Sequence, residues 1–215
     1  MDDPDAERGM AMKDQSIRQY VRLYRKALEK QGFPDTEAKA GHYEERLSSM
    51  LSSPRFQEHN VYPSMNVELI YAVIAMCLEL RGFGLTDKEI MTFTEVVFAR
   101  RRKFFDTLIR MIDLLPNSFQ IAKKWNISDH AKRVQDHSII YDDFTVSENV
   151  VEYRISKCMY AEMFDTYGIR GLCKIFCNTD TRSYAGLRRH VRFVRHSDLS
   201  DGPCCWDEVH RKGSR

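Results

Sequence analysis

Several classes of protein are excluded by what the sequence lacks. No run of apolar residues is long enough to cross a bilayer. The first ten residues, MDDPDAERGM, are acidic and lack the apolar segment of a secretory signal. These absences predict a cytoplasmic location and no membrane partner. The formal net charge is only +2 over 215 residues, so bulk charge gives no reason to expect a nucleic-acid partner.

Common chemical motifs are missing too. The chain has no C-x-x-C pair, Gly-rich phosphate loop, internal repeat or low-complexity tract. It has six cysteines, but in a cytoplasmic chain of this length an even count indicates reduced thiols rather than disulfides. The histidines at positions 190, 196 and 210 are scattered. The sequence therefore predicts no metal site and no cofactor.

The first half of the chain carries helical patterns. From Asp14 apolar residues recur at 3.6-residue spacing, and after Pro34 either Asp35 or Thr36 can cap a second helix that runs to about Leu51. Residues 65–81, MNVELIYAVIAMCLELR, are apolar nearly all round, which predicts a central buried helix. Thr86 and Glu89 fit a capping box, so one long helix is expected from there to about Leu114.

The second half changes in texture. Four segments are β-branched, aromatic or alternating in pattern, and predict strands: 138–147, 149–157, 190–196 and 204–210. Residues 158–168 return to helical spacing. The predicted fold class is therefore α+β, with an N-terminal layer of four helices followed by a small antiparallel sheet with two inserted helices. We expect one domain over residues 14–215, after a disordered tail at residues 1–13.

The most informative stretch is GLCKIFCNTDTRSYAGL, residues 171–187. Cys173 and Cys177 are four residues apart and share one face of a helix. Asp180 can cap a helix over 181–188, and a thiol near that N-terminus would have a lowered pKa and be a better nucleophile. A Cys177 buried in the core, with Asp180 serving only as a cap, explains the same spacing.

The segment that follows is basic. Arg182 and Arg192 lie within a run of five arginines between positions 181 and 195. An arginine can hold a substrate carboxylate with two hydrogen bonds, so both are candidates for substrate binding. A solvated strand face explains most of these arginines equally well.

Taken in order, the motifs resemble a known family. The first motif is AVIAMCLELRGFGLTDKE, and the second is CMYAEMFDTYG, which contains Cys158, Tyr160, Phe164 and Gly168. The third is LCKIFCNTD, which contains Cys177 and Asp180. Phe193 with Arg195 follows, and the last is Gly202 with a late cysteine. This combination resembles the L-2-amino-thiazoline-4-carboxylic acid hydrolase family over roughly residues 60–207. The chain departs from the family pattern at Gly202-Pro203-Cys204-Cys205, which leaves the roles of Cys204 and Cys205 open.

The resemblance implies a single hydrolase-like domain that opens the five-membered ring of a small-molecule substrate to give an N-carbamoyl-cysteine. Our hypothesis gives Cys177 the role of nucleophile or thiol donor, and Asp180 the role of orienting water or accepting a proton. The supporting residues are Tyr160 as a hydrogen-bond donor, Cys158 facing the same region, and Arg182 or Arg192 on the carboxylate.

Two other classes stay open. The chain could be a biosynthetic enzyme of different ring chemistry in secondary metabolism, or a non-catalytic small-ligand-binding domain. The second would use an aromatic pocket on the sheet, formed by Tyr141, Phe144, Tyr153, Phe193 and Trp206. The sequence also leaves open the true substrate, whether a metal takes part in the reaction, and whether the protein is a homo-oligomer.

Overall fold

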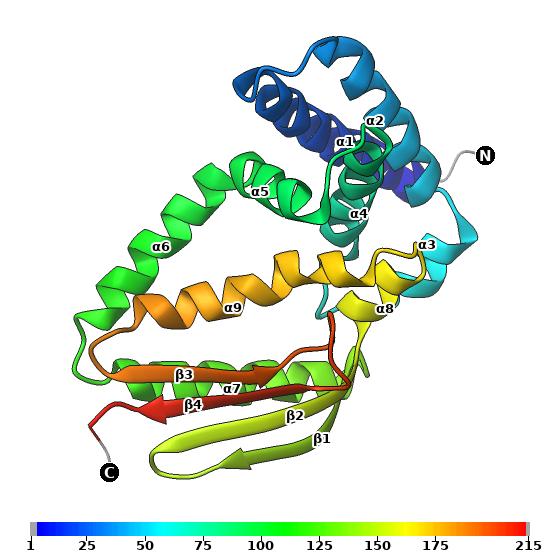
Figure 1. Cartoon of the computed structure of the whole chain (residues 1–215). Helices are drawn as coiled ribbons and strands as arrows, with labels where there is room; N and C mark the ends of the chain where they lie inside the picture. Colours follow the sequence, from blue (N-terminus) through cyan, green and yellow to red (C-terminus); the bar gives the residue numbers. More distant parts are fainter. Residues whose placement is uncertain (1–3, 214–215) are drawn as a thin grey trace. The chain divides into compact units, whose positions relative to one another are not determined.

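The computed structural model describes residues 4–213 and places them in two compact units (Figure 1). Unit 1 consists of the residues up to Val61 together with Asn66–Ala99. Unit 2 consists of Tyr62–Met65 together with the residues from Arg100 onward. The family-like motifs run through both units, and the prediction of one domain over 14–215 stays a prediction.

Unit 1 is built from helices around one buried helix. Its elements are α1 (Pro4–Lys30), α2 (Thr36–Leu51), α3 (Pro54–His59), α4 (Val67–Gly82) and α5 (Asp87–Val97). Eleven of the sixteen residues of α4 are buried, and α4 packs against the other four helices. The prediction of a central buried helix is therefore confirmed.

Aromatic residues from the other helices complete this core. Tyr24 and Tyr43 are fully buried, with their ring centroids 4.5 Å apart. The hydroxyl of Tyr43 donates a hydrogen bond of 3.0 Å to the carbonyl oxygen of Ala72 in α4. A buried phenol needs such a partner, because an unpaired polar group in an apolar core costs free energy.

The helix boundaries of unit 1 agree with the sequence patterns in part. The capping box at Thr86 and Glu89 is present, and α2 ends at Leu51 as expected. Asp35 occupies the N-cap position of α2, but its side chain makes no capping hydrogen bond. Helix α1 begins at Pro4, ten residues before the expected start at Asp14, and residues 1–3 of the predicted tail lie outside the described residues.

The predicted long helix to Leu114 is wrong, because two helices occupy that range. Helix α5 ends at Val97 and α6 begins at Ala99 and runs to Asp113. No proline or glycine marks the break. Near it, the hydroxyl of Thr94 donates to the carbonyl oxygen of Met91 at 2.7 Å. Hydrogen bonds of this kind compete with the helix ladder and bend helices.

Unit 2 contains the sheet. Besides α6, its elements are α7 (Ser118–Gln135), β1 (Ile139–Val146), β2 (Val150–Cys158), α8 (Met159–Asp165), the 3₁₀ turn η1 (Arg170–Cys173), α9 (Lys174–Gly186), β3 (Val191–Ser197) and β4 (Cys205–Arg211). The four strands pair antiparallel in the order β1-β2-β4-β3. All four predicted strands are confirmed, and so is the α+β class.

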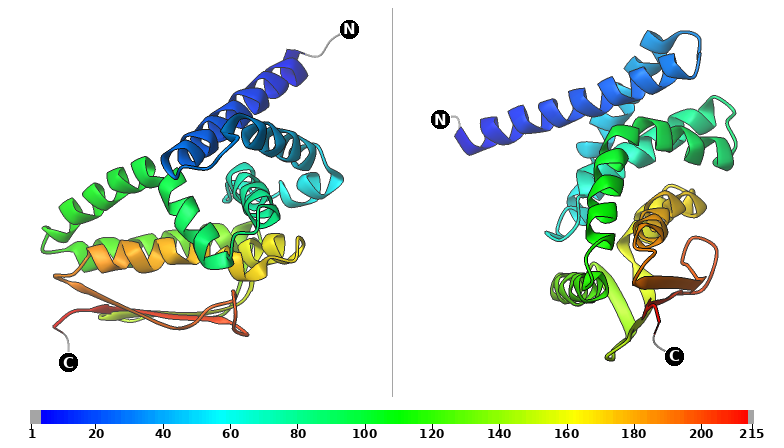
Figure 2. Two further views of the ribbon diagram at one scale, coloured as in Figure 1. Left: turned by 45° about the horizontal axis from the view of Figure 1, so that its top comes forward. Right: turned by 90° about the vertical axis from the view of Figure 1, so that its left-hand side faces the viewer.

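Two helices pack against the sheet. Helix α7 contacts β1 and α9 contacts β3, and both lie over the same face of the sheet (Figure 2). Tyr153 on β2 and Asp207 on β4 are buried on that face. The opposite face carries Trp206, which is stacked between Arg154 and His196.

Three predictions for the helices of this region are wrong. In the described residues seven helices, not four, precede the first strand, and α7 was not expected. Asp180 does not cap a helix over 181–188, because it lies inside α9. Asn178, Thr179 and Asp180 were interpreted as loop residues, but the hydroxyl of Thr179 donates back to Phe176 and that of Ser183 to Thr179, so the polar residues are accommodated within the helix.

None of the helices within residues 4–213 combines the length and the apolar character that crossing a membrane requires.

Candidate active site

One cross-strand row of the sheet positions the site. Antiparallel pairing sets Phe144 on β1 opposite Tyr153 on β2, Tyr153 opposite Asp207 on β4, and Asp207 opposite Arg195 on β3. Side chains directly opposite one another point to the same face. The row therefore presents two aromatic rings, a carboxylate and a guanidinium to the helices.

Arg195 and Asp207 form a bidentate ion pair. Arg195 Nε and Nη2 donate to the two carboxylate oxygens of Asp207, each at 2.8 Å. The side chains are only 15% and 2% exposed. This planar geometry is the strong form of a charge-assisted pair, and it fixes the orientation of the guanidinium. Burial alone would lower the pKa of Arg195, but the hydrogen bonds that Arg195 donates to Asp207 outweigh this effect, so the pKa is raised and the guanidinium stays charged.

The same guanidinium connects the sheet to α9. Arg195 Nη1 donates a hydrogen bond of 2.9 Å to the backbone carbonyl of Cys177. Arg195 Nη2 lies 3.8 Å from Oδ2 of Asp180. One side chain thus contacts both residues that the sequence singled out. We call Cys177, Asp180, Tyr153, Arg195 and Asp207 the Arg195 cluster.

The surroundings of Cys177 lower the pKa of its thiol. A hydrogen bond with the Cys173 thiol, one helical turn earlier, lowers the pKa of Cys177. Burial opposes this effect and the Arg195 guanidinium reinforces it, so the net shift is downward. The partner thiol of Cys173 is buried, and its pKa is raised. A lowered thiol pKa increases the thiolate fraction, which is the nucleophilic form.

Asp180 has the opposite shift. Surrounding protein raises the pKa of its carboxyl to about 6, although Arg195 opposes the rise and Asp207 adds to it. Yet 59% of the side chain is accessible to solvent. Protein atoms therefore surround the Asp180 carboxyl group closely enough to raise its pKa but leave much of the side chain open to solvent.

Helix α7 lies beside the Arg195 cluster and contacts both α9 and β1. Asn126 Nδ2 donates to the hydroxyl of Tyr184 on α9 at 2.7 Å, so α7 and α9 are bridged. Arg133 of α7 is close enough to Asp180 to lower the pKa of that carboxyl. The His130 ring stacks on Phe144 with ring centroids 3.8 Å apart. The sheet row and the two helices therefore bring aromatic and charged side chains together.

Tyr160 and Cys158 lie at the end of this region. The ring of Tyr160 packs against Phe176 of α9 with ring centroids 4.9 Å apart, and burial raises the pKa of Tyr160. Cys158 precedes α8, and burial raises its pKa to about 11, with a smaller contribution from the nearby Cys177. Of the residues singled out from the sequence, the structure thus brings Cys158, Tyr160, Cys177 and Asp180 together.

The structure does not bring Arg182 or Arg192 to the cluster. Arg182 lies two residues after Asp180, about 200° around the helix, and faces α6. Arg192 is exposed on β3, where it is paired with His210 on the outer face of the sheet. Arg195 and Arg133 occupy the position near Asp180 that had been expected for them.

The structure also distinguishes the two late cysteines. Cys205 is buried opposite Ile155 on the inner face, and burial raises its pKa to about 12. Cys177 contributes to that rise, so the two thiols are neighbours. Cys204 instead contacts the hydroxyl of Ser197 at 3.7 Å. In the described part of the chain, His, Cys, Asp and Glu side chains form no group of three or more that could hold a metal ion.

The thiol of Cys177 and the carboxylate of Asp180, both on α9, thus lie beside the Arg195 guanidinium on the helix-covered face of an antiparallel sheet. A model of the L-2-amino-thiazoline-4-carboxylic acid hydrolase family matches residues 75–206, which is more than half of the chain. The chain belongs to this family. The matched range includes every member of the Arg195 cluster except Asp207, which lies one residue beyond it. No curated protein and no solved structure matches the chain.

Proposed function

We propose that the protein is a hydrolase that opens a small cyclic C–N/C–S substrate of the 2-amino-thiazoline-4-carboxylate type to an N-carbamoyl-cysteine. The observation that supports this most is the contact of Arg195 with both Cys177 and Asp180 inside a family-matched sheet. It supplies a nucleophile, a proton acceptor and a fixed positive charge in one place.

The substrate is polar at both ends, and the cluster has groups for each end. The ring carbon between nitrogen and sulfur is amidine-like, so its N–H groups suit the Asp180 carboxylate. The substrate carboxylate requires a guanidinium. Arg133 and Arg195 both act on Asp180 electrostatically, and we propose them for this role in place of Arg182 and Arg192. The aromatic rings of Tyr153 and Phe144 would cover the flat ring.

The chemistry proceeds in two balanced steps. The Cys177 thiolate adds to the ring carbon, the ring C–S bond breaks, and the departing sulfur takes a proton, for which Tyr160 is the proposed donor. Water then adds to the same carbon while Asp180 accepts its proton. The bond to Cys177 breaks, which leaves the carbamoyl oxygen on the product and regenerates the thiolate. The second proton of the water passes to the former ring nitrogen, and Asp180 returns its proton to Tyr160. Arg195 stabilises negative charge that develops beside Cys177.

A second route uses the same residues differently. Water activated by Asp180 adds directly to the ring, and the Cys177 thiol donates the proton to the departing sulfur. The two routes differ in whether a covalent adduct forms on the protein, and mass spectrometry can detect such an adduct. In the covalent route, rapidly quenched protein gains the mass of one whole substrate at the peptide containing Cys177, whereas the direct route leaves the protein unmodified.

The test is the release of free thiol from 2-amino-thiazoline-4-carboxylate by purified variants. We expect Cys177→Ser and Asp180→Asn to lose at least about 100-fold in kcat, the low end for a positioned acid or base. Cys204→Ser is the matched control, because Cys204 contacts Ser197 and lies outside the cluster. Full turnover in both cluster variants, with unchanged melting temperatures, would refute the proposal.

The two remaining classes can be separated by thiol chemistry. A thiol-blocking reagent should abolish an enzyme that depends on Cys177, and should leave a pure ligand-binding domain able to bind. An enzyme of different ring chemistry would keep its sensitivity to the reagent but release no thiol from the thiazoline. Screening cyclic amidines with the same variants would then identify its substrate.

A further inference from the structure

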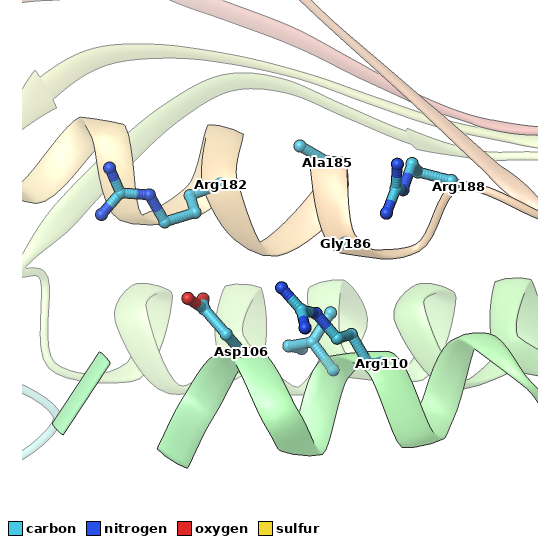
Figure 3. A pocket seen from close by; sticks show the side chains of 7 residues that line it. Asp106, Arg110, Arg182, Ala185, Gly186 and Arg188 are labelled. Carbon is cyan, nitrogen blue, oxygen red and sulfur yellow. The ribbon is translucent and has the colours of Figure 1, made fainter. Parts of the chain in front are cut away.

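A second site lies on the other side of α9. A cavity of about 240 Å³ opens between α6 and the C-terminal half of α9, both in unit 2 (Figure 3). Its apolar lining is Ile109, Ala185 and Gly186. A Cβ atom at Gly186 would overlap the side chain of Ile109, so the missing side chain lets the two helices approach closely here.

Charge dominates the rest of the lining. The cavity is lined by Arg110 of α6, Arg182 within α9 and Arg188 just after α9, together with a single carboxylate, Asp106. The charged side chains therefore sum to about +2. In Figure 3, Asp106 and Arg110 point from α6 toward α9. Within the described residues Arg110 and Arg188 make no ion pair.

Arg110 and Arg188 line the same cavity without an ion-pair partner among the described residues, and an anion between two guanidinium groups removes the repulsion between them. Arginine also matches phosphate and carboxylate oxygens with paired N–H donors, better than a point charge does. The volume is below the about 300 Å³ at which sites for drug-sized ligands begin, so the ligand is small.

We propose that this cavity binds a small multivalent oxyanion, either free phosphate or the phosphate group of a small phosphomonoester. The ligand's oxygens pair with Arg110 and Arg188, and any short carbon body lies on Ile109 and Ala185. Because Arg182 and Asp180 face opposite sides of α9, this site is separate from the Arg195 cluster and takes a second ligand. The bound anion joins α6 to α9.

The experiment is calorimetric titration of the full chain with sodium phosphate, with sodium chloride adjusted to keep ionic strength constant. We expect saturable binding of one phosphate per chain. The double variant Arg110→Gln/Arg188→Gln should weaken it at least tenfold. Arg101→Gln is the matched control, since Arg101 is an exposed arginine of the same helix that does not line the cavity. Circular dichroism spectra verify that each variant is folded.

A second variant keeps every charge and removes the space. Ala185→Leu fills the cavity, and we expect it to abolish binding while Cys177→Ser leaves binding unchanged. Titration with glycerol 3-phosphate separates the sources of the anion: tighter binding than phosphate identifies a phosphomonoester, and weaker binding identifies free phosphate. Absence of saturable binding for both anions overturns the proposal, as does equal weakening by Arg101→Gln or full binding by the Arg110/Arg188 double variant.

Discussion

In helix α4 of unit 1, eleven of sixteen residues are buried, whereas among the thirteen described residues of α9 in unit 2 none is buried. Both helices have other elements of their own unit beside them. The neighbours of α4 are apolar and aromatic side chains that exclude water. The neighbours of α9 are the charged row of the sheet on one side and an arginine-lined cavity on the other.

The difference separates stability from chemistry. A helix buried all round contributes free energy through hydrophobic burial and leaves no space for a ligand. Helix α9 lacks such burial. Its Cys177 and Asp180 are partly accessible on one face, and Arg182 is accessible on the other. Sites of function commonly sacrifice local stability in this way. Substitutions in the two helices should therefore separate loss of folding from loss of activity.

The largest effect is expected where unit 2 does bury charge. Arg195→Met leaves the Asp207 carboxylate buried and unpaired, which should lower the free energy of unfolding by about 3–5 kcal/mol. Urea denaturation followed by tryptophan emission measures it, because Trp125 and Trp206 both belong to unit 2. Arg154→Met, on the outer face of the same sheet, should cost about 1 kcal/mol or less. Equal losses would contradict the buried pair.

A direct comparison of the two helices comes next. Ile74 in α4 is completely buried, so Ile74→Ala should destabilise by about 2–5 kcal/mol. Ile175 in α9 is only half-buried, and Ile175→Ala should cost less than about half of that. Far-UV circular dichroism in urea detects both. If the two alanine variants lose the same stability, α9 is part of an apolar core after all.

A smaller effect tests the local rules that shape unit 1. Thr86→Ala removes the N-cap of α5 and should cost about 1 kcal/mol in urea denaturation. The matched control is Thr92→Ala in the middle of the same helix. Thr92 is exposed, so its replacement by alanine should be neutral or slightly stabilising. A neutral Thr86→Ala would mean that the capping box contributes nothing to α5.

The smallest effect on stability concerns Asp180 and pH. Its folded pKa of about 6 lies above the ordinary value of 3.8, so the native state holds the proton more tightly. Stability from this group is present at low pH and is lost as pH rises from about 4 to 6. Asp180→Asn should therefore raise the melting temperature relative to the unmodified chain more at pH 8 than at pH 4. The solvent exposure of the side chain keeps this shift small.

The same group sets the expected pH dependence of activity. If ionised Asp180 accepts a proton from water, kcat/KM should fall about tenfold per pH unit below a midpoint near pH 6. The residual activity of Asp180→Asn should lack this acid limb. A limb that persists in the variant would assign it to another group.

The parts of the fold that could be predicted are those with a strong local pattern. The alternation in β2, β3 and β4 predicts the strands, and the apolar run of α4 predicts burial. Helix α7 escaped prediction because its apolar residues are dispersed around the helix, so that Trp125, Ile127 and Val134 are exposed. The break before α6 has no proline or glycine to announce it.

The site was predictable in the same partial way. Cys177 and Asp180 share a helix face because both lie inside α9, three residues apart. The sequence singled out the two residues but put the start of the helix in the wrong place. Arg182 and Arg192 were chosen for their charge. Arg195 was named among the motif residues without a role, and the register of the sheet places it beside Asp207. The sequence contains one pattern from which Asp207 could have been identified. It alternates with Cys205 and Val209 on the buried face, and a charge in that position requires a partner.

The central claim is that the reacting ring lies at the Arg195 cluster. The most direct measurement is a crystal structure of the Cys177→Ser variant soaked with 2-amino-thiazoline-4-carboxylate. The account predicts the ring carbon about 3–3.5 Å from the side-chain oxygen at position 177, with Asp180 on the amidine nitrogens. A ring bound away from α9, or only in the cavity between α6 and α9, would contradict it.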